Sequence, residues 1–165
     1  MKKFISIIIG SKSDWSVMEA AVKVLDDFSV PYELIISSAH RSVNRTKNYV
    51  KAAEEKGASV FIAAAGMAAH LAGAIASQTT KPVIGVPINS SSLNGLDALL
   101  STVQMPPRMP VATMAIGEAG AINAAYFAMQ ILSLSDINLA NKLIESRKKE
   151  EEKIELDSKQ IEKLI

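Results

Sequence analysis

A run of mostly β-branched residues, Phe4-Ile5-Ser6-Ile7-Ile8-Ile9, leads directly into a small polar loop, Gly10-Ser11-Lys12-Ser13-Asp14. A short apolar run that ends at glycine and serine is typical of a buried strand. The following residues, 14–28, carry Met18, Ala21 and Leu25 at helical spacing. Together these residues predict one strand–loop–helix unit.

The same alternation of a short apolar run and a longer helical pattern recurs along the chain. The predicted strands cover residues 4–9, 31–36, 60–64, 83–86 and 111–116. The predicted helices cover residues 14–28, 44–56 with Gly57 as C-cap, 68–78, 93–103 and 120–134. Consecutive units of this kind predict an α/β fold with a parallel sheet covered on both faces. We expect a flavodoxin-like three-layer sandwich with five strands in the order 2-1-3-4-5.

Residues 136–165 differ in composition from the rest of the chain. From Asn141 onward they contain seven Lys or Arg and seven Asp or Glu, with isolated leucines and isoleucines between them. The pattern fits either a solvated helix with ion pairs four residues apart or a helical arm that packs on another subunit, with a candidate break at Asp157-Ser158. We expect one flavodoxin-like catalytic domain over residues 1–135 and a C-terminal helical arm over residues 136–165.

The composition argues against several classes of protein. The chain has 165 residues, 48% hydrophobic residues and a net charge of +1, which fit one globular domain without a nucleic-acid partner. It has no cysteine for disulfides or thiolate metal sites, and its two histidines have few carboxylates near them, so we expect no metal. No segment approaches the ~20 apolar residues of a membrane span, and the N-terminal apolar run is too short for a signal peptide. We therefore expect a cytoplasmic protein without a membrane partner.

Polar loops follow the predicted strands, whose carboxyl ends meet at the edge of a parallel sheet where ligands bind. The loop that ends at Asp14 offers backbone N–H groups, serine hydroxyls and the positive end of a helix dipole, which suit a phosphate. Asp14 can accept hydrogen bonds from a ribose diol. In Ser37-Ser38-Ala39-His40-Arg41-Ser42, Arg41 can bind a phosphate or carboxylate, and His40 can move protons near neutral pH.

Two further loops complete this predicted edge. Residues 65–71 place Gly66 where the backbone can approach a ligand and His70 one turn into the next helix, and residues 87–95 form a polar loop. Purely structural interpretations also exist, because Ser11 or Ser13 can cap the first helix and Ser42 the second. The combination favours an active site, since both histidines of the chain fall just beyond predicted strand ends.

Several motifs, in this order, resemble the PurE family of purine biosynthesis. They are Gly10-Ser11-Lys12-Ser13-Asp14, Ser38-Ala39-His40-Arg41, Ala65-Gly66-Met67-Ala68-Ala69-His70-Leu71, Pro82-Val83-Ile84-Gly85-Val86-Pro87, Leu93-Asn94-Gly95-Leu96-Asp97, Val103-Gln104-Met105-Pro106 and Ala115-Ile116-Gly117. The resemblance covers the chain from about Ile5 to Leu132. It implies a homo-octamer with sites at subunit junctions, a small ribonucleotide substrate and no cofactor.

The Ser-Ala-His-Arg and Ala-Ala-His-Leu forms resemble the mutase class of this family. That class interconverts N5-carboxyaminoimidazole ribonucleotide and 4-carboxy-5-aminoimidazole ribonucleotide on the route to IMP. The resemblance implies that Ser11, Ser13 and Arg41 hold the phosphate, that Asp14 holds the ribose, and that His40 is the catalytic proton carrier. It assigns the remaining substrate-binding positions, most of them around the carboxyl group, to Ser38, Ala39, Ala65, Gly66, Ala68, His70 and Leu71.

Departures from the family pattern occur at Met67, Ala72, Pro107 and Glu118, where the family usually has Gly, Pro, Gly and Lys. We expect Met67 to narrow the pocket for carbon dioxide or to alter its loop. Two alternatives remain open: an enzyme of the direct carboxylase class, and a non-enzymatic module that binds a phosphate-bearing ligand. A response-regulator receiver and an FMN-binding flavodoxin fit less well, because the loops lack a phospho-acceptor Asp and stacking aromatic residues.

Overall fold

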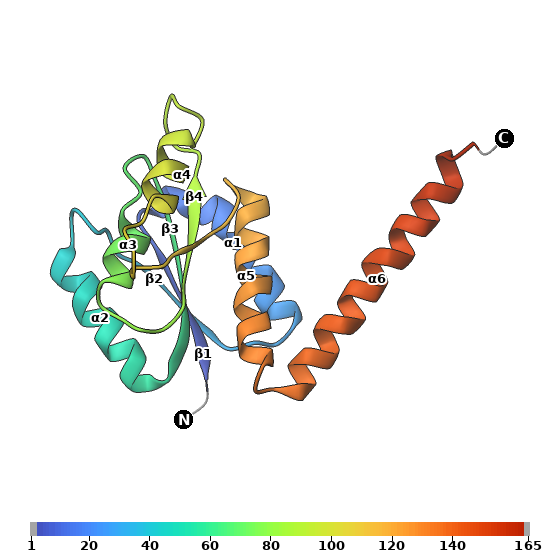
Figure 1. The fold of residues 1–165 in the computed structure, drawn as a ribbon, viewed down its shortest axis with the longest axis horizontal. Helices are drawn as coiled ribbons and strands as arrows, with labels where there is room; N and C mark the ends of the chain where they lie inside the picture. Colours follow the sequence, from blue (N-terminus) through green and yellow to red (C-terminus); the bar gives the residue numbers. More distant parts are fainter. Residues whose placement is uncertain (1–2, 164–165) are drawn as a thin grey trace.

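The computed structural model describes residues 3–163 and contains a central five-stranded parallel sheet (Figure 1). The strand order β2-β1-β3-β4-β5 confirms the order predicted from the sequence. The strands are β1 (Phe4–Ile9), β2 (Tyr32–Ile36), β3 (Ala58–Gly66), β4 (Val83–Ile88) and β5 (Ala112–Thr113).

Helices cover both faces of this sheet, so the predicted three-layer sandwich is confirmed. One face is covered by α1 (Trp15–Asp27) and α5 (Glu118–Ser133). The other face is covered by α2 (Val43–Lys56), α3 (Leu71–Ala76) and α4 (Leu96–Val103). As predicted, Gly57 ends α2 in the left-handed region, with φ 110°.

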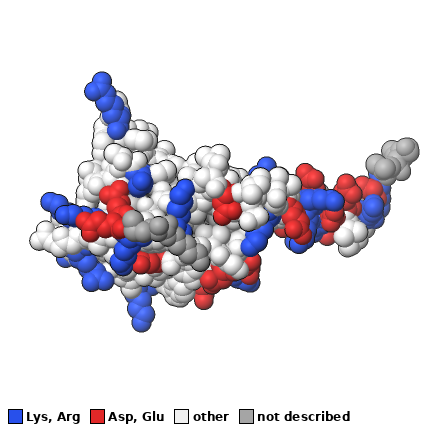
Figure 2. Space-filling model, turned by 90° about the horizontal axis from the view of Figure 1, so that it is seen from below, with Lys and Arg blue, Asp and Glu red and all other residues white. Residues whose placement is uncertain are grey.

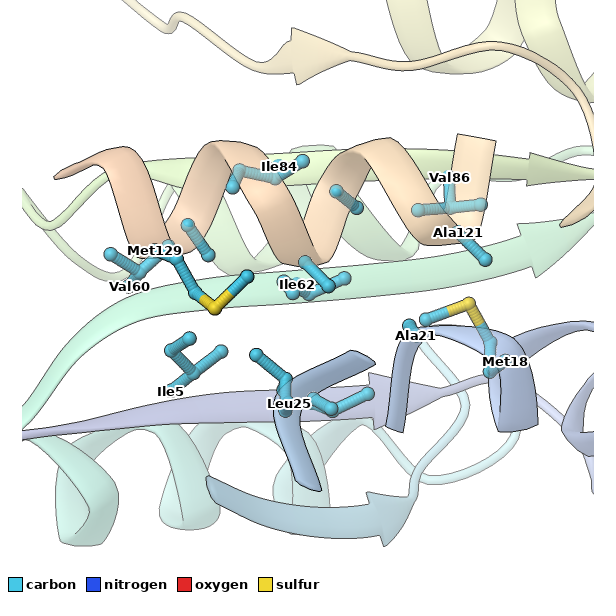
Figure 3. Packing of buried hydrophobic residues seen from close by; sticks show 14 of the residues in the cluster. Ile5, Met18, Ala21, Leu25, Val60, Ile62, Ile84, Val86, Ala121 and Met129 are labelled. Carbon is cyan, nitrogen blue, oxygen red and sulfur yellow. The ribbon is translucent and has the colours of Figure 1, made fainter. Parts of the chain in front are cut away.

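The run of isoleucines in β1 exists because both faces of this strand are buried. Ile5 lies in the cluster on the α1–α5 face, where Figure 3 shows it near Leu25 and Met129. Ile8 points to the opposite cluster, under α2 and α3. The hydrogen-bonded register of β1 places Ile9 beside Ile36 of β2 and Ala64 of β3, so β1 and β2 end together and β3 continues two residues further, to Gly66.

A chain of hydrogen-bonded polar side chains runs from the apolar core on the α2 side to the surface. Ser6, in the middle of β1, donates a 3.0 Å hydrogen bond to the hydroxyl of Tyr49 on α2. The Tyr49 hydroxyl donates in turn to a carboxylate oxygen of Glu33 at 3.3 Å. Lys56, at the exposed end of this chain, also binds Glu33 at 3.1 Å, and the buried Ser6 hydroxyl has Tyr49 as its partner, so its burial is tolerated.

Several predicted boundaries are wrong for local reasons. β4 continues to Ile88 through Pro87, whose missing N–H is tolerated because β5 pairs with β4 only as far as Gly85. β5 has two residues instead of the six predicted, over 111–116. α4 begins at Leu96 and not at residue 93, because Gly95 takes the left-handed φ of 83°. α3 begins at Leu71 and not at residue 68.

The C-terminal segment forms one long helix, α6 (Ile137–Ile161), which leaves the body of the molecule (Figure 1). Asp136 caps it by accepting hydrogen bonds from the backbone N–H groups of Asn138 and Leu139. Charges of both signs cover the part that protrudes (Figure 2). The predicted break at Asp157-Ser158 is wrong, because the helix continues past it and the Ser158 carbonyl accepts from the Glu162 N–H.

Candidate active site

Four loops meet at the carboxyl edge of the sheet, where β1 lies between β2 and β3. β2 pairs with one edge of β1, and β3, the next strand along the chain, pairs with the opposite edge of β1. The strand order therefore reverses here, which makes this the topological switch point of the sheet. A cavity of about 530 Å³ opens there. It is lined by Gly10, Ser11, Ser13, Asp14, Ser38, Ala39, His40, Arg41, Ala65, Gly66, Met67, Ala68, His70, Leu71 and Ser90.

Every site residue named from the sequence is among the residues that line this cavity. The parallel register explains the convergence, since β1 and β2 end level with each other, and β3 and β4 end level with each other two residues further along. Gly10 is tied to β3 by a 2.9 Å hydrogen bond from its N–H to the Ala64 carbonyl. Ser37 is tied to β1 in the same way, by a 2.9 Å bond to the Ile9 carbonyl.

The loop after β1 turns directly into a short 3₁₀ helix, Lys12–Asp14, which leads into α1. Ser11 caps it, because its hydroxyl accepts a 3.3 Å hydrogen bond from the Ser13 N–H. The Ser11 and Ser13 hydroxyls also lie 2.9 Å apart. Ser11 therefore caps this short 3₁₀ helix and not α1, whose N-cap residue Asp14 makes no side-chain capping bond, and both serines line the cavity.

Asp14 is the buried acid of the site, with only 3% of its surface exposed. Burial raises the pKa of its carboxyl, while hydrogen bonds from Ser11 and Ser13 and the positive charge of Arg41 oppose that rise. The cost of burying this carboxylate is therefore partly offset by these hydrogen bonds and by Arg41. The Asp14 oxygens make no capping hydrogen bond to α1.

Arg41 joins the loop after β2 to the loop after β1. One guanidinium nitrogen, Nη2, donates to the Gly10 carbonyl at 3.3 Å. The Arg41 N–H donates to the hydroxyl of Ser38 at 3.2 Å. Arg41 has no carboxylate within ion-pair distance among the described residues, so its charge remains available to an anion in the cavity.

Ser42 does not cap α2 with its side chain, so that structural interpretation of the loop is wrong. Its hydroxyl instead accepts from the Ser38 N–H at 2.8 Å and donates to the Ser38 carbonyl at 3.1 Å. These two bonds close the loop that displays His40 and Arg41. Ser42 does not line the cavity itself, but its hydrogen bonds to Ser38 hold the loop whose His40 and Arg41 do.

The loop after β3 passes very close to Ser90, which follows β4. A Cβ atom built on Gly66 would lie only 1.7 Å from the Ser90 hydroxyl oxygen and 2.9 Å from the Ser90 Cβ, so any other residue there would force Ser90 to move. Met67 then takes a left-handed φ of 56°. His70 is the residue just before α3 and does not lie one turn into the helix as predicted, because the turn at residues 67–70 delays the helix start.

Sequence reasoning missed the specific role of Ser90 in this geometry. It lay in a polar loop that was expected to cover or donate to a site, but only the register of β3 with β4, Gly66 beside Ile88, brings it against Gly66. The motifs at residues 93–97, 103–106 and 115–117 do not line this cavity. Within residues 3–163, no group of three or more His, Cys, Asp or Glu comes together as a metal site.

Within the same residues, no helix is long and apolar enough to span a bilayer.

Comparison with known proteins gives a consistent family. A family model described as AIR carboxylase matches residues 4–153. The chain is 53% identical to the N5-carboxyaminoimidazole ribonucleotide mutase of Bacillus subtilis over 89% of this chain and 91% of that protein. It is 50% identical to the mutase of the same name from Pyrococcus horikoshii, over 99% of this chain and 91% of that protein.

Solved structures agree with this assignment. A crystal structure of Treponema denticola PurE superposes with a TM-score of 0.88 at 26% identity, covering 98% of this chain and 99% of that chain. The resemblance of the sequence motifs to the PurE family is thereby confirmed. The chain belongs to the AIR carboxylase family.

Proposed function

We propose that this protein is an N5-carboxyaminoimidazole ribonucleotide mutase, an isomerase of de novo purine (IMP) biosynthesis. It would move the carboxyl group of its substrate from N5 to C4, which gives 4-carboxy-5-aminoimidazole ribonucleotide. The observation that carries the proposal is one cavity that gathers a serine pair, a free arginine, a buried aspartate and two histidines. Relatives at about half identity that bear the name of this mutase support it.

The 5′-phosphate would bind between the loops after β1 and β2. Ser11 and Ser13 offer hydroxyls 2.9 Å apart, and Arg41 is anchored on the Gly10 carbonyl with donors to spare. Asp14 lines the same cavity and would accept hydrogen bonds from the ribose hydroxyls. The nucleotide is thereby fixed at its charged end, and the ring is directed toward His40 and the β3 loop.

His40 would carry the one proton that the reaction needs. As an acid it protonates N5, the bond between N5 and the carboxyl carbon breaks, and carbon dioxide leaves. The electron-rich C4 then attacks carbon dioxide, and a new carbon–carbon bond forms. His40, now a base, removes the proton from C4 and restores the aromatic ring, so that substrate and product have the same atoms.

The carboxyl group would be held by the second half of the cavity. Ser38, Ala39, Ala65, Gly66, Ala68, His70 and Leu71 are the residues that we assign to it and to the loop beside it. Apart from Ser38 and His70, these are small or apolar residues that add no side-chain hydrogen-bond donors, as expected of a site that must hold an uncharged gas for a moment. Because C4 is already nucleophilic, neither a metal nor another cofactor is required.

We also propose a cytoplasmic homo-octamer in which α6 packs as an arm on a neighbouring subunit. A phosphorylated substrate does not cross membranes, which supports the location. The assembly is supported by large apolar side chains that one subunit leaves exposed. Leu96, Leu100 and Val103 form a stripe along α4, which Leu93 extends just before the helix, and Ile154 and Ile161 are 65% and 82% exposed on α6.

The assembly can be measured by light scattering, which should give eight times the 17.7 kDa of the monomer. Leu100→Glu should reduce that mass, because it places a charge in the apolar stripe, whereas Ser101→Glu on the neighbouring exposed position should not. A monomer in the unmodified protein, or equal masses for both variants, would contradict the assembly.

The activity is tested by offering two substrates separately: N5-carboxyaminoimidazole ribonucleotide alone, and aminoimidazole ribonucleotide with bicarbonate. Rapid formation of 4-carboxy-5-aminoimidazole ribonucleotide from the first, above a blank without protein and lost in His40→Asn, supports the mutase. Formation from the second substrate only would assign the protein to the direct carboxylase class. No product from either, with folded protein, would leave ligand binding as the role of the cavity.

A further inference from the structure

Met67 has an unusual backbone conformation for its residue type. Its φ of 56° lies in the left-handed region, where a side chain with a Cβ atom meets steric strain that glycine avoids. The surrounding loop enforces this conformation. On one side of Met67, Gly66 lies close against Ser90. On the other side, two tight turns follow: the Ala69 N–H donates to the Met67 carbonyl at 2.8 Å, and the His70 N–H donates to the Ala68 carbonyl at 2.7 Å.

The strained residue lies at the rim of the cavity. Leu71, which begins α3, is 2% exposed, and Ala65 and Gly66 at the end of β3 are half-buried. Met67 lines the cavity as well, but 61% of its surface is exposed. It is therefore a large apolar side chain held at the mouth of the half of the cavity that we assign to the carboxyl group, between Gly66 and Ala68.

We propose that Met67 is a retention residue, whose side chain covers the carboxyl pocket and slows the escape of carbon dioxide before C4 captures it. This inference rests on the proposed function and adds a residue to it. Met67 stands at φ 56° where the family usually has glycine, and strained residues of this kind cluster at functional sites. A thioether chain is flexible and polarizable, so it can fold over ligands of irregular shape and exclude water.

The experiment follows a substrate labelled with ¹³C in its N5 carboxyl group, in buffer that contains unlabelled bicarbonate. The fraction of label in the C4 carboxyl of the product measures retention, and free aminoimidazole ribonucleotide, corrected for a blank without protein, measures escape. The variants are Met67→Gly, Met67→Ala and Met67→Leu. Ser29→Gly serves as a matched control, because Ser29 has the same φ of 56° but lies just after α1, away from the cavity.

Met67→Gly and Met67→Ala should raise the ratio of escaped to retained carboxyl about fivefold, which corresponds to a lowering of the escape barrier by about 1 kcal/mol. Met67→Leu, which keeps the apolar bulk, should retain label like the unmodified protein. Met67→Gly should also keep or raise the melting temperature, by up to about 4 °C, because it relieves strain. Ser29→Gly should show the same thermal behaviour with unchanged retention.

Two results distinguish this inference from the proposed function itself. If the unmodified protein converts the substrate and Met67→Gly and Met67→Ala retain label equally well, the retention role is wrong and the mutase assignment stands. If the unmodified protein makes no product from N5-carboxyaminoimidazole ribonucleotide, the proposed function fails first. If Ser29→Gly released as much carbon dioxide as Met67→Gly, the inference would also be overturned, because relief of backbone strain far from the cavity would then produce the same effect.

Discussion

Replacing Gly66 by alanine tests how tightly the loop after β3 is packed against the loop after β4. The added methyl carbon would lie 1.7 Å from the Ser90 hydroxyl oxygen, 2.9 Å from the Ser90 Cβ and 3.1 Å from the Ile88 carbonyl oxygen. Ser90 can rotate its hydroxyl away, but its Cβ and the Ile88 carbonyl belong to the backbone framework and must move. Overpacking of this kind costs about 1–3 kcal/mol.

The expected effect is measurable in both stability and activity. A loss of 1 kcal/mol lowers the melting temperature of a protein of this size by about 2–4 °C, so Gly66→Ala should melt about 2–12 °C lower. The same shift displaces the loop that carries His70 at the cavity wall. A displacement near 1 Å can reduce turnover about 100-fold, and we expect the reduction in kcat with the proposed substrate to approach that size.

A second variant makes this prediction specific. Ser90→Gly removes both Ser90 atoms that the new methyl group would meet, so the double variant should recover much of the melting temperature lost by Gly66→Ala. Gly10→Ala is the steric control, because its Cβ would meet its nearest neighbours at an ordinary 3.5 Å and should not lower the melting temperature by overlap. An unchanged melting temperature in Gly66→Ala, or no recovery in the double variant, would refute the packing described here.

Three other changes have defined outcomes. Because burial raises the pKa of Asp14 above its usual value of 3.8, the ionised form destabilises the fold, so Asp14→Asn should melt higher at pH 7. That gain should vanish as the pH falls to 3.8 and below, and a gain that is constant with pH would contradict it. Tyr49→Phe leaves the buried Ser6 hydroxyl without its acceptor, and denaturant unfolding should show a loss of about 1–3 kcal/mol while KM stays unchanged. Arg41→Lys keeps the charge but loses the planar donor fork that reaches the Gly10 carbonyl, so KM should rise at least as much as kcat falls, and an unchanged KM would remove Arg41 from the phosphate site.

The sequence contained enough to predict the sheet order and the location of the cavity. The alternation of buried strands and amphipathic helices determines an α/β fold, and the first strand was predicted with its observed limits, Phe4–Ile9. Parallel strands end at one edge, so residues that follow strands could be expected to meet. All the site residues named from the sequence do line one cavity, although their roles stay predictions.

What the sequence could not supply depends on contacts between distant residues. His70 precedes α3 because the turn at Met67 delays the helix, and the small apolar residues 68–78 alone resemble a helix start. Ser90 faces Gly66 only through the pairing of β3 with β4. The sequence also suggested a break in α6 at Asp157-Ser158, because these residues have low helix propensity. The helix is continuous there, since the residues on both sides are good helix formers.

The most direct test of the central claim compares His40→Asn with the unmodified protein in two assays. Calorimetric titration measures the binding of 4-carboxy-5-aminoimidazole ribonucleotide, and product formation from N5-carboxyaminoimidazole ribonucleotide measures turnover. If His40 carries the proton in a site that the other residues build, the variant should bind the nucleotide with a similar Kd while kcat falls by about 10²–10⁴-fold. Turnover close to that of the unmodified protein, in a variant that binds and folds normally, would contradict the account.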